Sequence, residues 1–397
     1  MALSTVQTLE EALKTLYLEP LIKTIDTGSG PVFAKIDKNS KNVVGEDIKF
    51  ALQYGRHGGI GARGESDDLP APSPRKYKQG VTSTKNLYGR ISFSEKLMKI
   101  SKNNAASFAD QVSTQMEDIT VDIRDMMRRN FMGKSDGIMG QVKTAVTSQK
   151  NVVVKGRIKT FYAGQIVDIF TLSGTAIDTK KVDAKMIVDV DYATSTISFA
   201  DNVTVGADDY ISLAGNYGKE LIGLKEILTK DSTIYGIDRS TNKWYNPLVF
   251  DKKSTGSTVA FSSMYLQEAI DEIEDYTGDK PDFITCNSGM LRAYINEQNT
   301  YKRNIEYTKV DGGVELVSYG KVPISKEKYM DDNTIYLINT KDLTLAQVAD
   351  WGWMDADGSI LSRVAEKAAY EATLTKYAEL ICRRPSAQAI ITGITAA

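Results

Sequence analysis

The sequence predicts an α+β fold in which a small all-β domain is inserted between two helix-containing parts. Three observations lead to this prediction. Residues 36–100 contain too few apolar side chains to bury a core of their own. Residues 101–150 carry one long amphipathic helix, and residues 151–216 form a series of short strands separated by turns. The chain has 397 residues, more than one hydrophobic core usually holds, so two or three domains are expected.

Residues 1–35 are expected to form an N-terminal arm that carries a short amphipathic helix at 6–25. Leucines recur near helical spacing in this stretch, and Thr8 is suited to cap its start. The glycine-rich run from Asp26 to Pro31 ends the helix. The arm is therefore predicted to be a single helix followed by a turn.

Residues 36–100 predict an extended two-stranded loop. Strand-like pieces surround Val44–Leu52 and Gly80–Phe93, and the glycine-rich stretch Gly55–Gly64 lies between them as a tip. Loops longer than about 15 residues are usually either functional or disordered. An isolated two-stranded hairpin is only marginally stable in water, so this loop needs a surface on which to lie.

Residues 103–131 carry the clearest helix of the chain. Apolar residues at three- and four-residue spacing share one of its faces, namely Phe108, Val112, Met116, Ile119, Ile123, Met126 and Met127. Asn103 or Asn104 is suited to the N-cap, and Gly133 ends the helix. At about 1.5 Å per residue the helix is roughly 42 Å long. A helix of this length is predicted to act as a spine across which other layers pack.

Residues 151–216 predict a small barrel or sandwich. Short strands alternate apolar and polar residues, with Gly, Asp, Asn and Ser turns between them. Asp208 and Asp209 are expected in one of these hairpin turns. Because helices precede and follow the stretch, it has the sequence pattern of an inserted domain.

Residues 217–345 return to mixed structure, and 346–397 complete the chain. We expect a helix at Ser262–Tyr276 that ends at Gly278, and a strand at Asp282–Cys286 that is followed by Asn287 as a helix cap. Between residues 360 and 382, composition favours a helix while the alternation of apolar residues favours a long strand. A last short strand is expected at Ala389–Thr392, and both assignments of the preceding stretch stay open.

No arrangement typical of an active site is found around the single histidine, His57. It lies in the glycine-rich tip, where the rigid support that a catalytic base requires is lacking. The run Gly58–Gly64 lacks the following Gly-Lys-Ser/Thr and the helix of a phosphate loop, and the acidic stretch Glu65–Asp68 beside it would repel phosphate. We therefore expect neither catalysis nor a cofactor at the tip.

Other candidate sites also have simpler interpretations. Asp355–Gly358 resembles the start of a calcium loop but lacks its later acids, so a turn is expected. Cys286 and Cys382 lie in apolar runs without metal-ligand spacing and are expected to be buried. Trp351 and Trp353 share one strand face, which favours core or subunit-interface packing over ligand recognition. The sequence thus predicts no enzyme, no cofactor and no metal site.

Charge and hydropathy exclude two further classes of protein. The formal net charge of −2 argues against a chain that coats nucleic acid tightly. No apolar stretch approaches the roughly 18 residues of a membrane span, and the N-terminus lacks the pattern of a signal peptide. We expect synthesis in the cytosol.

Basic residues spread over the second half of the extended loop. Few aromatic residues accompany them, so base stacking is disfavoured, and a solvated face, an acidic neighbour and nucleic acid remain as alternatives. We expect the loop to contact other subunits through Arg56, His57, Arg63, Glu65, Lys76, Lys78, Lys85 and Arg90.

An ordered set of motifs covers nearly the whole chain and resembles the major capsid proteins of tailed bacteriophages, with the Hong Kong 97 (HK-97-like) fold. The motifs are Gly61–Glu65 with Leu69–Pro70, Tyr88–Leu97, Phe108–Gly140, Glu220–Leu224, Pro281–Asn287, Ser318–Ile324, Ile335–Asn339 and Cys382–Thr392. In that family an N-terminal arm leads to an extended loop, a spine helix in a peripheral domain, and an axial domain around the capsomer centre.

The resemblance assigns a part of that fold to each stretch of the chain. It implies an arm at 1–35, the extended loop at 36–100, the peripheral domain at 101–150, the insertion at 151–216, a mainly axial stretch at 217–345, and a return to the peripheral domain with the C-terminal strand at 346–397.

The resemblance implies a function in self-assembly into an icosahedral head around double-stranded DNA. The chain would bind copies of itself in hexamers and pentamers, with a separate scaffolding protein, a portal and a decoration protein as further partners. Packaged DNA would be contacted weakly, and the protein would reside in the virion. The runner-up interpretations are an encapsulin-like shell, which usually lacks a β insertion, and a surface adhesin, which would require a secretion signal.

Overall fold

The computed structural model describes residues 23, 25, 28–41, 43–44, 47–96, 105–156, 158–300, 307–310, 314–355 and 360–396. The chain forms two units, one made of Met1–Arg129 with Lys225–Ala397 and the other of Asn130–Leu224. The helix predicted at 6–25 falls almost entirely outside the described residues.

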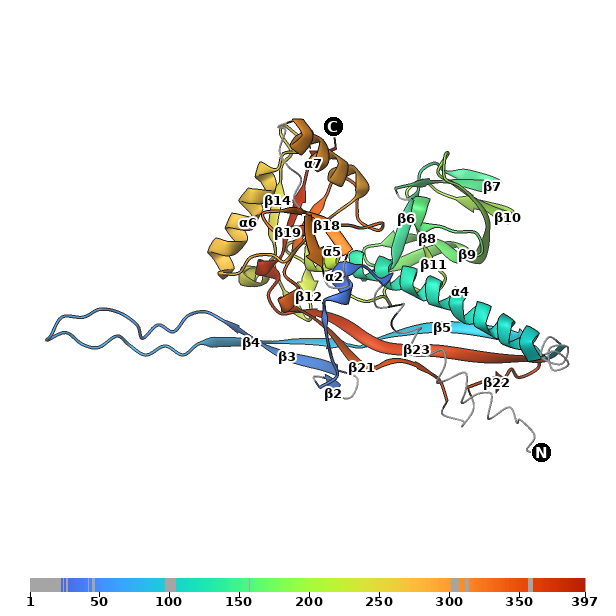
Figure 1. Ribbon diagram of the computed structural model, residues 1–397, viewed down its shortest axis with the longest axis horizontal. Helices are drawn as coiled ribbons and strands as arrows, with labels where there is room; N and C mark the ends of the chain where they lie inside the picture. Colours follow the sequence, from blue (N-terminus) through green and yellow to red (C-terminus); the bar gives the residue numbers. More distant parts are fainter. Residues whose placement is uncertain are drawn as a thin grey trace. The chain divides into compact units, whose positions relative to one another are not determined.

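The peripheral part of the first unit is a β-sheet. The long helix α4 (Ala105–Met132) runs alongside two of its strands, β5 and β23 (Figure 1). The strand order is β1-β21-β23-β22, and β5 also pairs with β23. Its strands are β1 (Asp37–Asn39), β5 (Lys85–Ser94), β21 (Leu343–Trp353), β22 (Ser362–Arg363) and β23 (Ala369–Cys382). The open choice at 360–382 is therefore settled as strand, because antiparallel pairing with β5 and β21 supplies the hydrogen bonds of β23.

From Thr114 onward, where the side chains of the spine helix are described, the predicted apolar face is the one that is buried. Met116, Ile119 and Ile123 are each less than 8% exposed. On β5, alternate residues are buried, as expected of a strand with one face covered. Gly89 lies on that buried face, and a Cβ atom there would come within 2.4 Å of Ile123 Cδ1. Glycine at this position thus permits the close approach of helix and sheet.

The extended loop begins with a three-stranded sheet of order β2-β3-β4. The strands are β2 (Val43–Val44), β3 (Asp47–Tyr54) and β4 (Lys76–Ser83), and Figure 1 shows the hairpin reaching away from the rest of the first unit. The single strand expected at Gly80–Phe93 is in fact divided between β4 and β5, because from Lys85 onward the backbone pairs with β23. The expected extended loop of 36–100 thus contains two strands, β1 and β5, that belong to the peripheral sheet.

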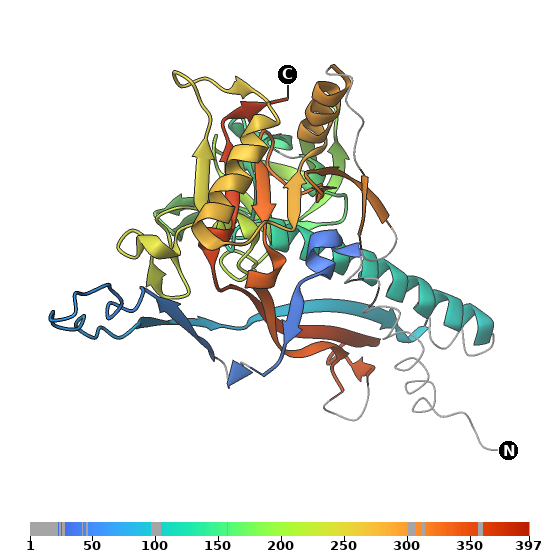
Figure 2. The same ribbon diagram turned by 60° about the vertical axis from the view of Figure 1, so that its left-hand side comes forward.

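The axial part of the first unit is a mixed sheet of order β14-β24-β20-β16-β19-β18-β17, and helix α6 lies across it (Figure 2). Its elements are β14 (Leu248–Asp251), α6 (Met264–Thr277), β16 (Phe283–Cys286), α7 (Ser288–Thr300), β17 (Tyr307–Val310), β18 (Val314–Tyr319), β19 (Val322–Lys326), β20 (Ile335–Ile338) and β24 (Ala389–Thr392). Gly278 ends α6 with a φ of 76°, and Asn287 Oδ1 accepts a hydrogen bond from the Met290 amide at 2.9 Å. Both predicted helix signals are confirmed.

Short elements connect these layers. They are α2 (Pro31–Ala34), α5 (Leu224–Ile227), β12 (Thr233–Ile234), β13 (Ile237–Asp238), β15 (Val259–Ala260), β25 (Ile394–Thr395), and the 3-10 turns η2 (Lys243–Tyr245), η3 (Thr340–Asp342) and η4 (Pro385–Ala387). Within the described part of the chain, no helix combines the length and the apolar character needed to cross a membrane.

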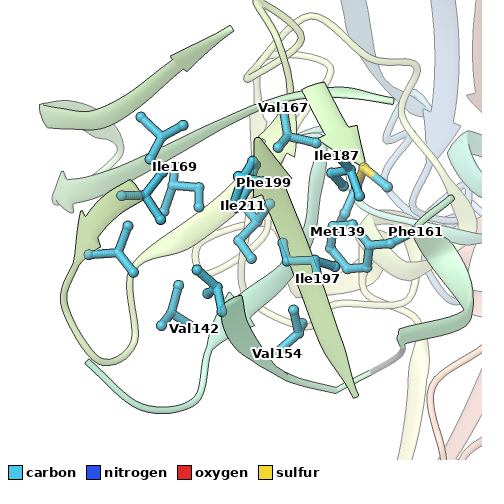
Figure 3. Packing of buried hydrophobic residues seen from close by; sticks show 14 of the residues in the cluster. Met139, Val142, Val154, Phe161, Val167, Ile169, Ile187, Ile197, Phe199 and Ile211 are labelled. Carbon is cyan, nitrogen blue, oxygen red and sulfur yellow. The ribbon is translucent and has the colours of Figure 1, made fainter. Parts of the chain in front are cut away.

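The second unit is a closed barrel of order β10-β7-β6-β11-β8-β9 with its own apolar core (Figure 3). Its elements are β6 (Ile138–Val142), β7 (Val146–Lys155), η1 (Ile158–Thr160), β8 (Ile166–Ser173), β9 (Ala176–Asp191), β10 (Thr196–Val205) and β11 (Tyr210–Leu213). Asp208 lies in a turn before β11 with a φ of 65°. The expected hairpin is wrong here, because β10 pairs with β7 and β9 while β11 pairs with β6 and β8.

The barrel begins at Ile138, earlier than the boundary at residue 151 expected from the sequence. The reason is closure, because β6 pairs with both β7 and β11 and no barrel forms without it. The ends of this unit also meet. A Cβ atom on Gly223 would come within 2.3 Å of the carbonyl oxygens of Asn130 and Gly133. The outgoing and returning backbones are therefore in contact, as in an inserted domain.

Candidate assembly surface

The residue types that usually carry chemistry are dispersed or buried. His57 is exposed on the loop, where its Nδ1 accepts a hydrogen bond from the Gly59 amide at 3.2 Å. Both cysteines are buried, and burial raises the pKa of the Cys286 thiol to about 12, so it is protonated at neutral pH. Among the described residues, no group of three or more His, Cys, Asp or Glu side chains could hold a metal ion.

The distal half of the extended loop, residues 55–75, is shaped by its own backbone. Its two arms approach where the Gly58 amide donates to the Ser73 carbonyl at 3.3 Å. At the tip, Arg63 Nε donates to the Asp68 carbonyl at 3.1 Å, and Asp67 Oδ2 accepts from the Gly64 amide at 2.8 Å. These local bonds give the tip a defined shape without contact to a core.

Two large apolar side chains on this distal half face solvent. Ile60 is 83% exposed and Leu69 is 87% exposed. Single exposed apolar residues are common, but here two of them occupy the tip of a loop that has no core. In the described chain they have no apolar surface to pack against, so a surface on another molecule would supply it.

The predicted contact residues fall into two groups. Arg56, His57, Arg63 and Glu65 are exposed on the distal half, and their contact with other subunits stays a prediction. The other four lie on strands, and two of those bond within the chain: Lys78 Nζ donates to Asn242 Oδ1 at 3.4 Å, and Arg90 pairs with Glu371 of β23. Lys76 is exposed at the start of β4, and Lys85 is partly buried at the start of β5.

The base of the loop rests on a segment that we call the root platform, residues 232–246. Phe50 of β3 meets Tyr235 edge to face at 5.3 Å between ring centroids. Tyr54, the last residue of β3, stacks on Trp244 at 4.5 Å with 4° between the planes. The Val81 amide of β4 donates to the Tyr235 carbonyl at 3.0 Å. The hairpin thus lies on its own subunit up to Tyr54. Among the described residues, the hydrogen bonds of the distal half run within the loop.

The root platform is itself tied to the interior. Arg239 is fully buried, and its guanidinium donates to the Ile227 carbonyl at 2.7 Å and to the Glu226 carbonyl at 2.9 Å. Tyr235 Oη donates to the Leu380 carbonyl at 2.7 Å, and Tyr245 Oη donates to the carbonyl of Cys382 at the end of β23. Burial raises the pKa of Tyr235 well above its usual value, so the hydroxyl remains a donor.

The spine helix is joined to the axial part by ion pairs. Arg128 Nε lies 2.7 Å from Glu327 Oε2, and that carboxylate is fully buried. Burial raises the pKa of Glu327, although Arg128 and the Ser325 hydroxyl oppose the shift. A second pair, Lys328 with Asp125 at 3.4 Å, lies beside it. These pairs hold the axial part against the helix that accompanies the peripheral sheet.

A third buried charge stabilises the peripheral sheet. Lys376 of β23 has a fully buried side chain, and its Nζ lies 2.7 Å from Asp350 Oδ1 of β21. Lys38 of β1 reaches the other oxygen of Asp350 at 3.1 Å. Burial alone would raise the pKa of Asp350, but the bond and charge of Lys376, the Trp351 amide and Lys38 outweigh it and lower the pKa to about 2.

Sequence reasoning missed the root platform. The prediction concentrated on the loop and its charges, whereas the aromatic residues that hold the loop base lie far away at Tyr235, Trp244 and Tyr245. The adjacent Trp244 and Tyr245, in a polar stretch without strand or helix periodicity, were the available signal. Trp351 and Trp353, for which core or interface packing is expected, are 2% and 5% exposed and belong to the core.

No protein-family model matches the chain, and no curated protein matches its sequence. Solved structures do match. One is a subunit of the cyanophage A-1(L) capsid asymmetric unit, with a TM-score of 0.55, 10% identity, and coverage of 92% of this chain and 93% of that chain. Another is the holo-SrpI encapsulin complex from Synechococcus elongatus, with a TM-score of 0.51, 7% identity, and coverage of 94% and 90%.

Both likenesses cover at least 90% of each chain, so they concern the fold as a whole and not one part of it. At identities of 10% and 7%, these likenesses show the fold alone. The chain has the HK-97-like capsid fold, with an inserted β-barrel.

Proposed function

We propose that this chain is the major capsid protein of a tailed phage or prophage and assembles into an icosahedral head around double-stranded DNA. The observation that carries the proposal is the distal half of the extended loop. In a chain with a capsid fold, Ile60 and Leu69 face solvent at the end of a hairpin that has no core. A neighbouring copy is the partner that would complete it.

Magnitudes favour the apolar residues as the source of binding energy. Burying one Ile or Leu side chain contributes about 1.5–3 kcal/mol. An exposed ion pair made by Arg56, Arg63 or Glu65 contributes at most about 1 kcal/mol. We therefore assign affinity to Ile60 and Leu69, and we assign the register between neighbours to the three charged residues.

The contact is heterologous, because the loop of one copy binds a different surface of the next. Heterologous contacts close into rings when the rotation permits it. This supports hexamers and pentamers as the building units. Each subunit both gives and receives one loop, so modest pair contacts accumulate over a shell.

The remaining partners follow from the same proposal. A scaffolding protein, a portal and a decoration protein are expected as separate chains. The formal net charge of −2 suits a wall that touches packaged DNA weakly, because a strongly basic wall would retain the genome. The protein would reside in the virion after synthesis in the bacterial cytoplasm.

The likeness to the SrpI encapsulin favours a second candidate, a cellular shell that encloses protein. The two candidates differ in what the shell encloses. Particles from the native source that contain nuclease-protected double-stranded DNA would support the head, whereas particles filled with a second protein would support the encapsulin-like shell.

Electron microscopy of the purified protein tests self-assembly. We expect closed shells of uniform size, and we expect Arg63→Glu to reduce shell formation while circular dichroism remains that of the wild type. Lys150→Glu is the matched control, because Lys150 is exposed on β7 of the barrel, away from the loop in sequence. Monomers at every concentration would contradict the proposal, and normal assembly of Arg63→Glu would contradict the assignment of register to that residue.

A further inference from the structure

The third tryptophan differs from the other two in its position. Trp351 and Trp353 are buried in the peripheral sheet, whereas Trp244 is partly exposed on the root platform. Its ring lies flat on that of Tyr54, with 4° between the planes and 4.5 Å between the centroids. Aromatic pairs in such contact contribute beyond the area that they bury. Because Tyr54 and Trp244 are both partly exposed, their stack is not part of the hydrophobic core.

The stack lies where the loop leaves its subunit. Tyr54 is the last residue of β3, and it pairs with Lys76, the first residue of β4. On the same face, Lys78 bonds to Asn242 of the root platform. Beyond Tyr54, the hydrogen bonds that fix residues 55–75 run within the loop itself. The stack is thus the outermost aromatic contact between the hairpin and its own subunit.

A contact at this point sets the direction in which residues 55–75 extend from the subunit. Two strands without a core hold their direction poorly, because an isolated hairpin is only marginally stable. The root platform is a fixed reference, since Arg239 and Tyr245 tie it to buried carbonyl groups. The stack of Tyr54 on Trp244 therefore restrains the end of β3 against the root platform, and the distal half extends from that end.

We propose that Trp244 and Tyr54 form a positioning clamp that fixes the direction of the distal loop, and thereby the angle at which neighbouring copies join. The inference rests on the proposed function, because it concerns how subunits of a shell meet. With the clamp, every copy presents Ile60 and Leu69 in one direction. Without it, copies join over a range of angles, and the shells vary in size.

The first experiment measures the clamp in unassembled subunits by hydrogen exchange. We expect Trp244→Ala to speed amide exchange in β3 and β4 by about three- to tenfold, since the hairpin then opens more often. Trp244→Phe retains a ring and is expected to restore slow exchange. Tyr77→Ala is the matched control, because Tyr77 lies on β4 of the same hairpin, is 65% exposed, and alternates to the opposite face from Lys76 and Lys78.

A second variant guards against misfolding of the platform. Tyr54→Ala removes the same stack from the loop side and leaves every platform residue in place. Circular dichroism and thermal unfolding identify any variant that fails to fold. Faster exchange in both Trp244→Ala and Tyr54→Ala supports the clamp, and unchanged exchange in folded protein overturns it.

The second experiment measures shell diameters by electron microscopy. We expect a single narrow distribution for wild type and for Trp244→Phe, and a broad distribution for Trp244→Ala. If folded Trp244→Ala forms shells as uniform as those of wild type, the positioning inference is wrong and the proposed function stands. If the wild type itself forms no shells, the proposed function fails, and the inference fails with it.

Discussion

The barrel and the distal half of the extended loop belong to different units of the chain, and they differ in how many of their apolar residues they bury within the chain itself. In the barrel every strand has a neighbour on both sides, and its interior residues Phe161, Ile169 and Ile211 are fully buried. In the loop, Ile60 and Leu69 are more than four-fifths exposed. The barrel thus buries its apolar residues within the chain, whereas the distal half of the loop leaves its apolar residues exposed.

The difference shows where to look for function in the described part of the chain. The barrel buries its apolar residues in its own core. The loop leaves apolar residues exposed, so we expect the surface that covers them to belong to another molecule. Substitutions in the two regions should therefore affect different measurements.

The largest effect on subunit stability is expected from Phe161→Ala in the barrel. Removing a fully buried Phe side chain costs about 3–5 kcal/mol through lost burial and the cavity left behind. Leu69→Ala, a truncation on the exposed loop, is expected to change the free energy of unfolding by less than about 0.5 kcal/mol. Chemical denaturation of unassembled subunits measures both, with the barrel transition followed for Phe161→Ala and the transition of the first unit for Leu69→Ala.

For shell formation, we expect the larger effect from Leu69→Ala and the smaller effect from Phe161→Ala. Leu69→Ala should raise the protein concentration needed for shell formation, whereas subunits of Phe161→Ala that remain folded should assemble at the wild-type concentration. A large loss of subunit stability in Leu69→Ala would mean that the tip packs on its own chain, and the contrast between the two regions would then disappear.

A medium effect is expected at the buried pair in the peripheral sheet. Asp350→Asn leaves Lys376 buried without its carboxylate, and we expect a loss of about 2 kcal/mol at neutral pH, less than for fully buried pairs because Asp350 is partly exposed.

The pH dependence has a defined sign. Because the folded pKa of Asp350 is lowered to about 2, its contribution is complete above pH about 4 and is lost as the pH falls toward 2. The difference between wild type and Asp350→Asn should therefore shrink over that interval, as measured by thermal unfolding at successive pH values. A difference that stays constant from pH 7 to 2 would exclude this role of the carboxylate.

The smallest effect is expected at Arg90, a predicted subunit contact that pairs with Glu371 of its own chain. The Arg90 side chain is 63% exposed, and such pairs contribute less than about 1 kcal/mol. Arg90→Ala should therefore leave both subunit stability and assembly close to wild type. A strong assembly defect in this variant would place β5, as well as the distal loop, at a subunit interface.

Sequence alone predicted the parts of the fold that depend on local periodicity and capping. The apolar face of α4, the Gly278 end of α6 and the Asn287 cap follow from spacing and residue type within a few turns. The exposed tip of the extended loop was also predictable, because its composition leaves nothing to bury. These signals are local, so neighbouring residues suffice to produce them.

Contacts between distant segments could not be predicted in the same way. Strand β6 is defined by closure of the barrel with β7 and β11, and its own sequence is short and interrupted by Gly140. The stack of Tyr54 on Trp244 joins residues far apart in the chain. Such pairings depend on tertiary arrangement, which periodicity within a single segment does not contain.

The most direct test of the central claim compares hydrogen exchange of residues 55–75 in unassembled subunits and in purified shells. If neighbouring copies complete the loop, these amides exchange rapidly in the subunit and become protected in the shell, while the barrel core is protected in both. Rapid exchange of residues 55–75 in closed shells would contradict the account.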